Sequence, residues 1–242
     1  MAGSSSIALP TPVDAMYLLK SLQGFRDKGI TAYAIGIQNE PENSDPTYPT
    51  CIFTPTQEAN VGSALRSLMD GNGFGGTKSN AYEHNWIYSG QFPIQVLQQA
   101  NSQFASAGFH CYAGDVGQQG QFENTFPSKG VYFDECMGLF GTDWWENIKW
   151  WTTCGSISSE ALCEPGRWPL TPNDSYTGSV NNWAKAVLMW NIALGSNGQP
   201  LLPGTRSCQN PFCRGVVTIN GGSYTLNEEC ELIPVRTVSD GG

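Results

Sequence analysis

Apolar and polar residues alternate along this chain in two patterns, one typical of amphipathic helices and one typical of short buried strands. In the longer stretches apolar side chains recur every three or four residues, which predicts helices. Between them lie short apolar runs bounded by glycine or polar residues, which predict strands. Helices are predicted at 14–28, 56–69 and 93–103, strands at 32–37, 81–86, 108–112, 130–135 and 186–190, and a Trp-rich helix from about Thr142.

The order of these elements predicts the fold class. Strands that alternate with helices form a parallel sheet, because a helical crossover must connect each strand to the next. The pattern changes near the end of the chain, where residues 215–219 and 223–226 flank the turn sequence Asn220-Gly-Gly222. This arrangement predicts a β-hairpin that opens a separate all-β segment.

Polar and aromatic residues stand where the predicted strands end. The carboxyl ends of parallel strands meet at one edge of a sheet or one mouth of a barrel, and ligands bind there in both architectures. We therefore expect these residues to converge, including both histidines of the chain. They are Asn39 and Glu40, then His84 to Trp86, then His110 and Tyr112, then Glu135, and last Trp190 with Asn191.

Composition narrows the function classes. The formal charge is −9 with 12 Lys and Arg, which argues against a nucleic-acid partner. No run approaches the roughly 18 to 20 apolar residues that would span a bilayer, so we expect a soluble protein without a membrane partner. Aromatic residues make up 12% of the chain, with eight Trp, a composition that suits a secreted protein that stacks sugars and that many ordinary folds share.

Eight cysteines predict an oxidising compartment. Cys208 and Cys213 are expected to close a short loop through a disulfide, whereas Cys111 and Cys136, inside apolar runs, are expected to be free buried thiols. Residues 1–12 lack the basic and apolar regions of a signal peptide. We expect an extracellular parent protein whose export signal is absent from this chain.

Two carboxylates at such strand ends suit glycoside cleavage, in which one protonates the leaving oxygen and the other attacks the anomeric carbon or directs water. Glu40 precedes Pro41, which favours an extended conformation for the residue before it and places Glu40 at a strand tip. Glu135 follows the apolar run Val131-Tyr-Phe133. Either residue could instead be a solvated loop carboxylate.

Seven segments between about Tyr17 and Glu229 resemble glycoside hydrolase family 30, in the order of that family, and look closest to its fungal endo-β-1,6-glucanases. They are Tyr33-Ala-Ile-Gly-Ile-Gln-Asn-Glu-Pro-Glu42, Tyr82-Glu-His-Asn-Trp86, Phe109-His-Cys-Tyr-Ala-Gly114, Val131-Tyr-Phe-Asp-Glu-Cys136, Thr142-Asp-Trp-Trp145, Leu188-Met-Trp-Asn-Ile-Ala193 and Cys213-Arg-Gly-Val-Val-Thr-Ile219.

The resemblance implies a (β/α)8 barrel with an attached β-sandwich and a retaining mechanism. It implies that Glu40, after the fourth strand, is the acid/base and that Glu135, after the seventh, is the nucleophile. Asn39 would hold the hydroxyl next to the anomeric carbon, and Trp190 would form the floor of the glycone subsite. The resemblance also suggests that His84, His110 and Tyr112 contact the substrate or the nucleophile at the rim.

The chain departs from the family pattern in three places. Strands one to three would precede residue 14, residues 154–175 interrupt an expected helix with three prolines, and the resemblance fades after Glu229. The predicted domains are therefore a partial barrel (strands four to eight) at 14–205, with an irregular surface insertion or retained intron at 154–175, and an incomplete β-sandwich segment at 206–242. Because five strands cannot close a barrel, we expect this chain alone to be inactive.

The predicted substrate is a β-1,6-linked glucan, as polysaccharide or oligosaccharide, and the predicted protein is a monomer without a cofactor. Two alternatives stay open, namely a hydrolase for another β-glycan such as β-1,6-galactan, and a non-catalytic carbohydrate-binding remnant that uses its tryptophans as stacking surfaces. Ligand chemistry also allows a metal site of His84, His110 and Glu135. No metal is predicted, because cleavage by a carboxylate pair needs none.

Overall fold

The structure is a computed structural model of the 242-residue chain, and it describes residues 11–139, 178–205, 207–208 and 212–227. These residues fall into two compact units. The first holds residues 11–136 and 178–188 of the described chain, and the second holds residues 137–139 and those from Met189 onward. The predicted domain boundary at residues 205 and 206 stays a prediction.

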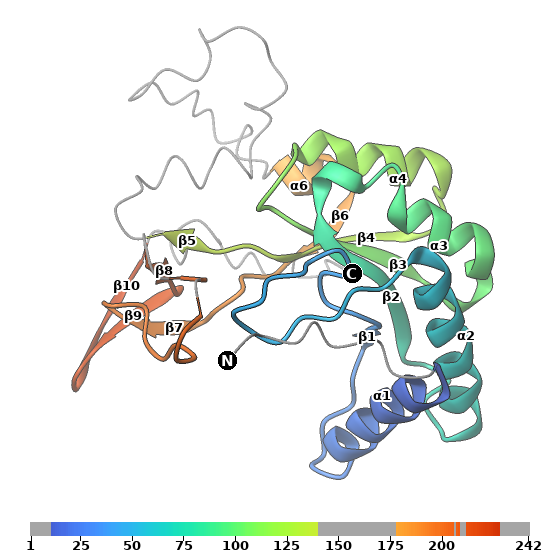
Figure 1. Cartoon of the computed structure of the whole chain (residues 1–242), viewed down its shortest axis with the longest axis horizontal. Helices are drawn as coiled ribbons and strands as arrows, with labels where there is room; N and C mark the ends of the chain where they lie inside the picture. Colours follow the sequence, from blue (N-terminus) through green and yellow to red (C-terminus); the bar gives the residue numbers. More distant parts are fainter. Residues whose placement is uncertain (1–10, 140–177, 206, 209–211, 228–242) are drawn as a thin grey trace, which may run out of the picture. The chain divides into compact units, whose positions relative to one another are not determined.

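A five-stranded sheet forms the centre of the first unit (Figure 1). Its strands lie side by side in chain order, and every neighbouring pair is parallel. The strands are β1 (Ala34–Gly36), β2 (Lys78–Asn85), β3 (Ser106–His110), β4 (Gly130–Glu135) and β6 (Ala184–Val187). The predicted α/β class with a parallel sheet is confirmed.

Helices connect these strands, as a parallel sheet requires. In Figure 1 the helices α2, α3 and α4 lie along one side of the sheet. The α-helices of the first unit are α1 (Thr11–Arg26), α2 (Pro55–Gly71), α3 (Phe92–Ala100), α4 (Gln119–Thr125) and α6 (Gly178–Asn181), and the 3-10 helices are η1 (Trp86–Tyr88), η2 (Asn101–Gln103) and η3 (Val116–Gln118).

The start of α2 illustrates how local sequence sets an element boundary. The Thr54 hydroxyl accepts a hydrogen bond from the backbone N–H of Gln57 (3.2 Å), and the Gln57 side chain accepts one from the backbone N–H of Thr54 (2.8 Å). This reciprocal capping box satisfies two donors at the helix start. Pro55 takes the first helical position, where no N–H is needed. The predicted helix at 56–69 is confirmed.

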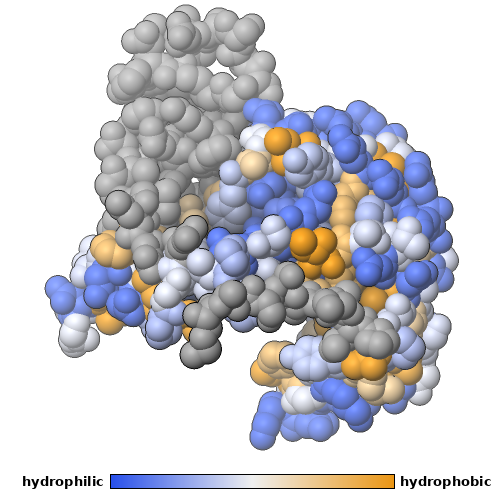
Figure 2. All heavy atoms as spheres, in the orientation of Figure 1, coloured by the Kyte–Doolittle hydropathy of each residue, from blue (hydrophilic) through white to orange (hydrophobic). Residues whose placement is uncertain are grey.

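Large side chains fill the space between the sheet and these helices. Their rings pack edge to face or stacked, as for Trp86 and Phe133, whose centroids are 5.3 Å apart. The largest fully buried apolar side chains are Tyr82, Trp86, Phe104, Phe109, Phe122, Phe133, Leu65, Met69 and Leu97. The outer surface over α2 to α4 is largely hydrophilic, with hydrophobic residues scattered among polar ones (Figure 2). This core fixes the sheet on which the site residues stand.

The second unit consists of short strands. A three-stranded sheet has the order β10-β9-β7, with β9 and β10 antiparallel and β7 parallel to β9. A separate antiparallel pair joins β5 to β8. The strands are β5 (Gly138–Leu139), β7 (Ala193–Gly195), β8 (Cys213–Arg214), β9 (Val217–Asn220) and β10 (Ser223–Leu226). The predicted hairpin is confirmed, while the predicted β-sandwich stays a prediction.

The last strand of the parallel sheet lies earlier in the chain than predicted. The run Ala186 to Trp190 was expected to be the strand, but β6 ends at Val187, and the Leu188 backbone N–H makes one more hydrogen bond, to the Phe133 carbonyl oxygen. The continuous apolar run predicted a strand over residues 186–190. The hydrogen bonds to β4 instead decide where the strand ends. Trp190 therefore does not end a strand of this sheet.

The sequence patterns did not predict α4 and η3. The α4 sequence Gln119-Gly-Gln-Phe-Glu-Asn-Thr125 has one large apolar residue, so no helical period of apolar residues is visible. The helix is instead entered through a capped turn at Asp115, whose side chain accepts from the Gly117 N–H (2.8 Å). The Trp-rich helix near Thr142 and the insertion at 154–175 lie outside the described residues.

Candidate active site

The carboxyl ends of the strands in the first unit bring most of the predicted residues together. Backbone pairing sets Asn85 opposite His110, and His110 opposite Glu135, across three neighbouring strands. A register shift precedes each of these pairs, between Tyr82 and His84 and between Phe109 and His110. Such bulges re-aim side chains at the end of a strand. The predicted convergence is confirmed for His84, His110 and Glu135.

Glu40 also lies at this edge, but its backbone conformation differs from the predicted one. Its φ is +47°, so it is not extended as the following proline predicted. Its backbone N–H donates to the Glu83 carbonyl oxygen (3.0 Å), and its own carbonyl oxygen accepts from the backbone N–H of Asn43 (2.9 Å). These two bonds hold a left-handed conformation that is unfavourable for a residue with a side chain. Strain of this kind concentrates at functional sites.

Both carboxylate oxygens of Glu40 have partners. Oε1 lies 3.1 Å from Nδ1 of His110 and 3.8 Å from Nδ1 of His84. Oε2 accepts a hydrogen bond from the Asn43 side-chain amide (2.6 Å), and the same amide nitrogen also contacts the Tyr48 hydroxyl (2.7 Å). Glu40 is therefore held by the His110 imidazole and the Asn43 amide, with the His84 imidazole beside it.

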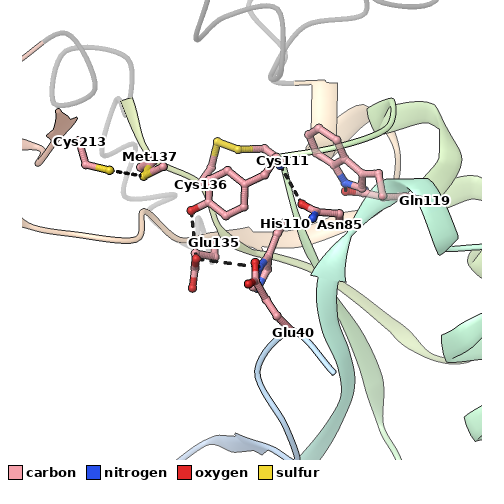
Figure 3. The surroundings of a disulfide bond; sticks show 11 residues. Glu40, Asn85, His110, Cys111, Gln119, Glu135, Cys136, Met137 and Cys213 are labelled. Atoms are coloured by element: carbon pink, nitrogen blue, oxygen red, sulfur yellow. Dashed lines mark hydrogen bonds and ion pairs between the residues drawn. A yellow bond between two sulfur atoms is a disulfide. The ribbon is translucent and has the colours of Figure 1, made fainter. Parts of the chain in front are cut away.

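Glu135 approaches the same imidazole. Its Oε1 lies 3.9 Å from Nδ1 of His110 and accepts a hydrogen bond from the Tyr112 hydroxyl (3.0 Å). The Oε1 atoms of Glu40 and Glu135 are therefore at most about 7 Å apart, the sum of their distances to the shared nitrogen. This upper limit admits the separation of roughly 5 Å found in retaining glycosidases and excludes most of the range of roughly 6.5 to 9.5 Å found in inverting ones. Figure 3 shows both side chains directed toward His110.

The two carboxyl groups differ in acidity. Burial raises the pKa of Glu40, but hydrogen bonds from His110 and Asn43, together with the charge of His110, outweigh burial and leave its pKa below the ordinary value. Burial also raises the pKa of Glu135, and there His110 and Tyr112 do not offset the effect. Burial lowers the pKa of His84 to about 4, which keeps its imidazole neutral.

A disulfide behind the site corrects the prediction of two free thiols. Cys111 and Cys136 form a bond with a Cα–Cα distance of 5.4 Å. They directly follow His110 and Glu135, which are opposite one another in β3 and β4, so the register places the two sulfur atoms side by side (Figure 3). An apolar run cannot reveal such a register. The predicted Cys208–Cys213 disulfide, in the second unit, is confirmed.

Two further acidic residues near the site were not singled out from the sequence. Burial raises the pKa of Glu83 to about 7, and burial together with the charge of Glu83 raises the pKa of Asp134 well above its ordinary value. Glycines make room for both, since a Cβ on Gly36 would lie 1.8 Å from the Glu83 carboxylate and one on Gly108 would lie 1.9 Å from that of Asp134. In the sequence Glu83 directly precedes His84 and Asp134 directly precedes Glu135, and this adjacency could have identified both.

Asp134 also contacts His110 from behind. Its Oδ1 lies 3.6 Å from Nε2 of His110, the ring nitrogen that faces away from Glu40. The imidazole of His110 thus lies between the carboxylates of Glu40 and Asp134, and its side chain is 2% exposed. Among the described residues, the side chains of Glu40, His84 and His110 place three possible metal-ligating atoms within 4.8 Å of one another.

Two predicted residues are not members of this cluster of the first unit. Asn39 precedes Glu40 but its side chain is exposed. Trp190 belongs to the second unit and is 38% exposed. Their roles stay predictions, as do the substrate-binding roles of His84, His110 and Tyr112.

Fold and site together define a parallel α/β protein with a pair of carboxylates at the carboxyl edge of its sheet. The endo-1,6-β-D-glucanase neg1 of Aspergillus fumigatus is 33% identical to this chain over 221 residues, which cover 88% of the chain and 38% of that protein. An endo-1,6-β-D-glucanase of Neurospora crassa is 32% identical over 223 residues, or 88% of the chain and 39% of the relative. The chain thus spans about two fifths of the length of these relatives.

Solved structures show the same fold. The endo-β1,6-glucanase BT3312 superposes with a TM-score of 0.74 at 22% identity, over 95% of this chain and 49% of that one. The catalytic domain of the GH30 xylanase C of Talaromyces cellulolyticus gives a TM-score of 0.55 at 19% identity, over 90% and 44%. No family model matches the chain. Its likeness to glycoside hydrolase family 30, and to the endo-β-1,6-glucanases in particular, is confirmed.

Proposed function

We propose that this chain carries the catalytic carboxylates of a retaining glycosidase that cleaves β-1,6-linked glucan, with Glu135 as nucleophile and Glu40 as acid/base. The supporting observation is that Nδ1 of His110 lies 3.1 Å from one carboxylate and 3.9 Å from the other. One imidazole therefore bonds to the Glu40 carboxylate and lies beside that of Glu135 at the edge of the sheet. The names of the relatives support the choice of β-1,6-glucan as substrate.

In the proposed reaction the Glu135 carboxylate attacks the anomeric carbon while Glu40 gives a proton to the departing glycosidic oxygen. A covalent glycosyl-enzyme forms, and the glycosidic bond breaks. Glu40, now ionised, takes a proton from water, the water oxygen attacks the anomeric carbon, and Glu135 is released. The Tyr112 hydroxyl, which donates to Glu135 Oε1, would hold the nucleophile in place during both steps.

The pKa of Glu40 is lowered, whereas an acid must be protonated for the first step. The pKa of Glu135 is raised, whereas a nucleophile must be ionised. His110 accounts for much of the effect on Glu40. When the negative charge of Glu135 is consumed in the glycosyl-enzyme, one source of repulsion at Glu40 disappears, which suits a general base in the second step. For the first step, Glu40 must gain its proton as the substrate excludes water from the site.

Substrate contacts are proposed from the resemblance. Asn39 would bind the hydroxyl next to the anomeric carbon, Trp190 would form the glycone floor, and His84, His110 and Tyr112 would line the rim. We also infer that the sheet of the first unit corresponds to strands four to eight of a (β/α)8 barrel and that the hairpin of the second unit opens a β-sandwich. The TM-score of 0.74 against a glucanase structure supports this correspondence.

An extracellular location is also proposed. The supporting observations are the Cys111–Cys136 and Cys208–Cys213 disulfides, since such bonds persist in oxidising compartments. None of the helices in the part of the chain that the structure describes is long and apolar enough to cross a membrane.

Turnover by residues 1–242 alone is proposed to be slow. Within the described sheet β1 is an edge strand that pairs through three residues with β2 alone, and Glu40 follows it. Edge strands with few hydrogen bonds open more readily than central ones. A displacement of the acid/base by about 1 Å costs on the order of 100-fold in rate. The expectation of complete inactivity stays a prediction.

Covalent trapping tests the proposal even if turnover is slow, because it needs one reaction per molecule. Incubation with a 2-fluoro-β-glucoside that carries a good leaving group should add one fluoroglucosyl group to Glu135, identified by peptide mass spectrometry. Glu135→Gln should abolish labelling. A matched control, Glu42→Gln, removes a carboxylate two residues after Glu40 and should label like the wild type.

Labelling at Glu40 would exchange the two roles, and labelling at neither residue would overturn the proposal. Release of reducing sugar from β-1,6-glucan, compared with β-1,6-galactan, tests the substrate. Calorimetric binding of a β-1,6-gluco-oligosaccharide without any trapping would instead identify a carbohydrate-binding protein.

A further inference from the structure

We propose that Glu40, His84 and His110 form a binding site for a divalent transition-metal ion such as Zn²⁺, and that the ion inhibits the carboxylate pair when bound. The ligand atoms are Oε1 of Glu40 and Nδ1 of each histidine. All three belong to the first unit. The binding site stands on this geometry alone, whereas the inhibition rests on the proposed function of Glu40.

The distances between the ligand atoms fit a small ion. In a tetrahedral zinc site, with bonds of about 2.0 to 2.2 Å, ligand atoms lie about 3.3 Å from one another. Oε1 of Glu40 lies 3.1 Å from Nδ1 of His110 and 3.8 Å from Nδ1 of His84. The three residues together offer one ligand atom each within 4.8 Å of one another. Small rotations of the two rings would bring the three atoms into the zinc geometry.

His84 has a nitrogen that the protein leaves unused. Its Nδ1 is buried and makes no hydrogen bond, although it faces Glu40. A buried polar atom without a hydrogen bond has a cost that a ligand can remove.

Asp134 supplies the support that metal-bound histidines usually have. Its Oδ1 is buried without a hydrogen bond and lies 3.6 Å from Nε2 of His110. If Nδ1 of His110 binds the ion, the ring proton must reside on Nε2, where Asp134 can accept it. A carboxylate behind a ligating imidazole fixes its tautomer and strengthens it as a ligand.

The composition of the site selects the class of ion. Two imidazoles and one carboxylate suit Zn²⁺ or Cu²⁺, whereas Mg²⁺ and Ca²⁺ prefer oxygen ligands. Glu135 Oε1, 3.9 Å from Nδ1 of His110, lies where it could approach the fourth position of the ion. The sequence alone had suggested Glu135 as the third ligand of a possible metal site. The structure brings Glu40 closer to both rings.

Bound Zn²⁺ would occupy Oε1 of Glu40 and displace any proton there, because metal and proton compete for the same lone pair. The acid/base could then neither donate nor accept a proton. We therefore expect Zn²⁺ to inhibit glycoside cleavage reversibly and a chelator to restore it.

Zinc titration of the metal-free 242-residue chain tests the site without any need for activity. Isothermal calorimetry should show saturable binding of one Zn²⁺ in excess Mg²⁺. The chain has two histidines, both in the site, so ring ¹⁵N NMR should show both imidazoles changing, with His110 carrying its proton on Nε2. His84→Gln and Glu40→Gln should each abolish tight binding, with the fold of each checked by circular dichroism.

Asp134→Asn should weaken Zn²⁺ about 10- to 100-fold. Asp70→Asn, which removes one charge from an exposed pair with Arg66, should bind like the wild type. Binding that survives both His84→Gln and Glu40→Gln, or ring signals unmoved at saturating Zn²⁺, would overturn the site. Binding as expected without any effect on an active enzyme would overturn only the inhibition, and an enzyme that fails the trapping test leaves the calorimetric result valid.

Discussion

The two units of this chain hold their strands together by different means. In the first, large aromatic and aliphatic side chains from the sheet and its helices are fully buried. In the second, the buried cluster in the described residues consists of Leu194, Cys208 and Cys213, with Met137 and Leu201 packed against it. Every residue of β10 is exposed. Packing therefore stabilises the first unit, whereas a covalent bond supplies much of the small core of the second.

Both units contain a disulfide, but the bonds have different surroundings. Cys111–Cys136 joins two strands that already pair along their length, next to the carboxylate Glu135. Cys208–Cys213 joins residues five positions apart, and both cysteines are themselves members of the buried cluster. The strand edge that carries Glu135 is therefore supported by packing and cross-linking together.

The largest expected effect is on packing in the first unit. Phe109 is fully buried on β3, with its ring 5.8 Å from Tyr82 and 6.0 Å from Phe122. Phe109→Ala should lower the free energy of unfolding by about 3 to 5 kcal/mol, measured by urea unfolding. Tyr224→Ala, at a position 69% exposed on β10, is the matched control and should change it by less than about 0.5 kcal/mol. Equal losses of stability in the two variants would contradict the conclusion that packing stabilises mainly the first unit.

The next effect depends on pH and should be confined to the first unit. Glu58 is fully buried on α2, its Oε1 accepts from the Tyr82 N–H (2.7 Å), and burial raises its pKa to about 8. The folded chain keeps this proton at pH values where the unfolded chain has released it. Stability is therefore greatest below about pH 4.5 for this group and is lost as the pH rises toward 8, by about 5 kcal/mol in total.

Glu58→Gln should flatten this dependence, because an amide cannot ionise and its oxygen can still accept from Tyr82. Hydrogen-exchange protection of β2 and β3 between pH 5 and 8, corrected for intrinsic rates, measures the effect. Glu83, whose pKa is raised to about 7, should leave a smaller total loss of the same sign, which ends near pH 7. An unchanged slope in the variant, or an equal slope in β9 and β10, would contradict the assignment to Glu58.

Removal of the Cys111–Cys136 disulfide should have a slightly smaller effect. The sequence separation is 25 residues, for which loop-closure entropy gives about 3.5 kcal/mol. The double variant Cys111→Ser, Cys136→Ser should therefore unfold at a lower temperature in calorimetry. The first unit should nevertheless stay folded at 25 °C, because its core remains. Complete unfolding of β2 to β4 in this variant would show that the packing does not suffice.

The smallest expected change in free energy follows removal of the Cys208–Cys213 disulfide. A separation of five residues gives about 2 kcal/mol. Because both cysteines belong to the small cluster, the local consequence should be large. In Cys208→Ser, Cys213→Ser, the amides of β9 and β10 should lose hydrogen-exchange protection while those of β3 and β4 keep theirs. Retained protection in β9 and β10 would mean that the hairpin needs no cross-link.

The places where sequence reasoning failed share a physical cause. The pattern placed the last parallel strand at 186–190, gave Cys111 and Cys136 free thiols, and made Glu40 extended. In each case the outcome depends on a partner that is distant in the sequence, namely β4 for β6, the register of β3 and β4 for the cysteines, and the Glu83 carbonyl for Glu40. Local patterns contain no information on which distant backbone groups will bond.

The sequence by itself determined the α/β class, the positions of the main helices, the hairpin and the polar residues at the strand ends, because periodicity and capping act over a few residues. Only the tertiary structure decided that His110 stands between Glu40 and Asp134, that Glu135 shares its nitrogen, and that Glu58 and Glu83 retain protons through burial. Those properties arise from strand register and exclusion of water, which exist only once distant segments have packed together.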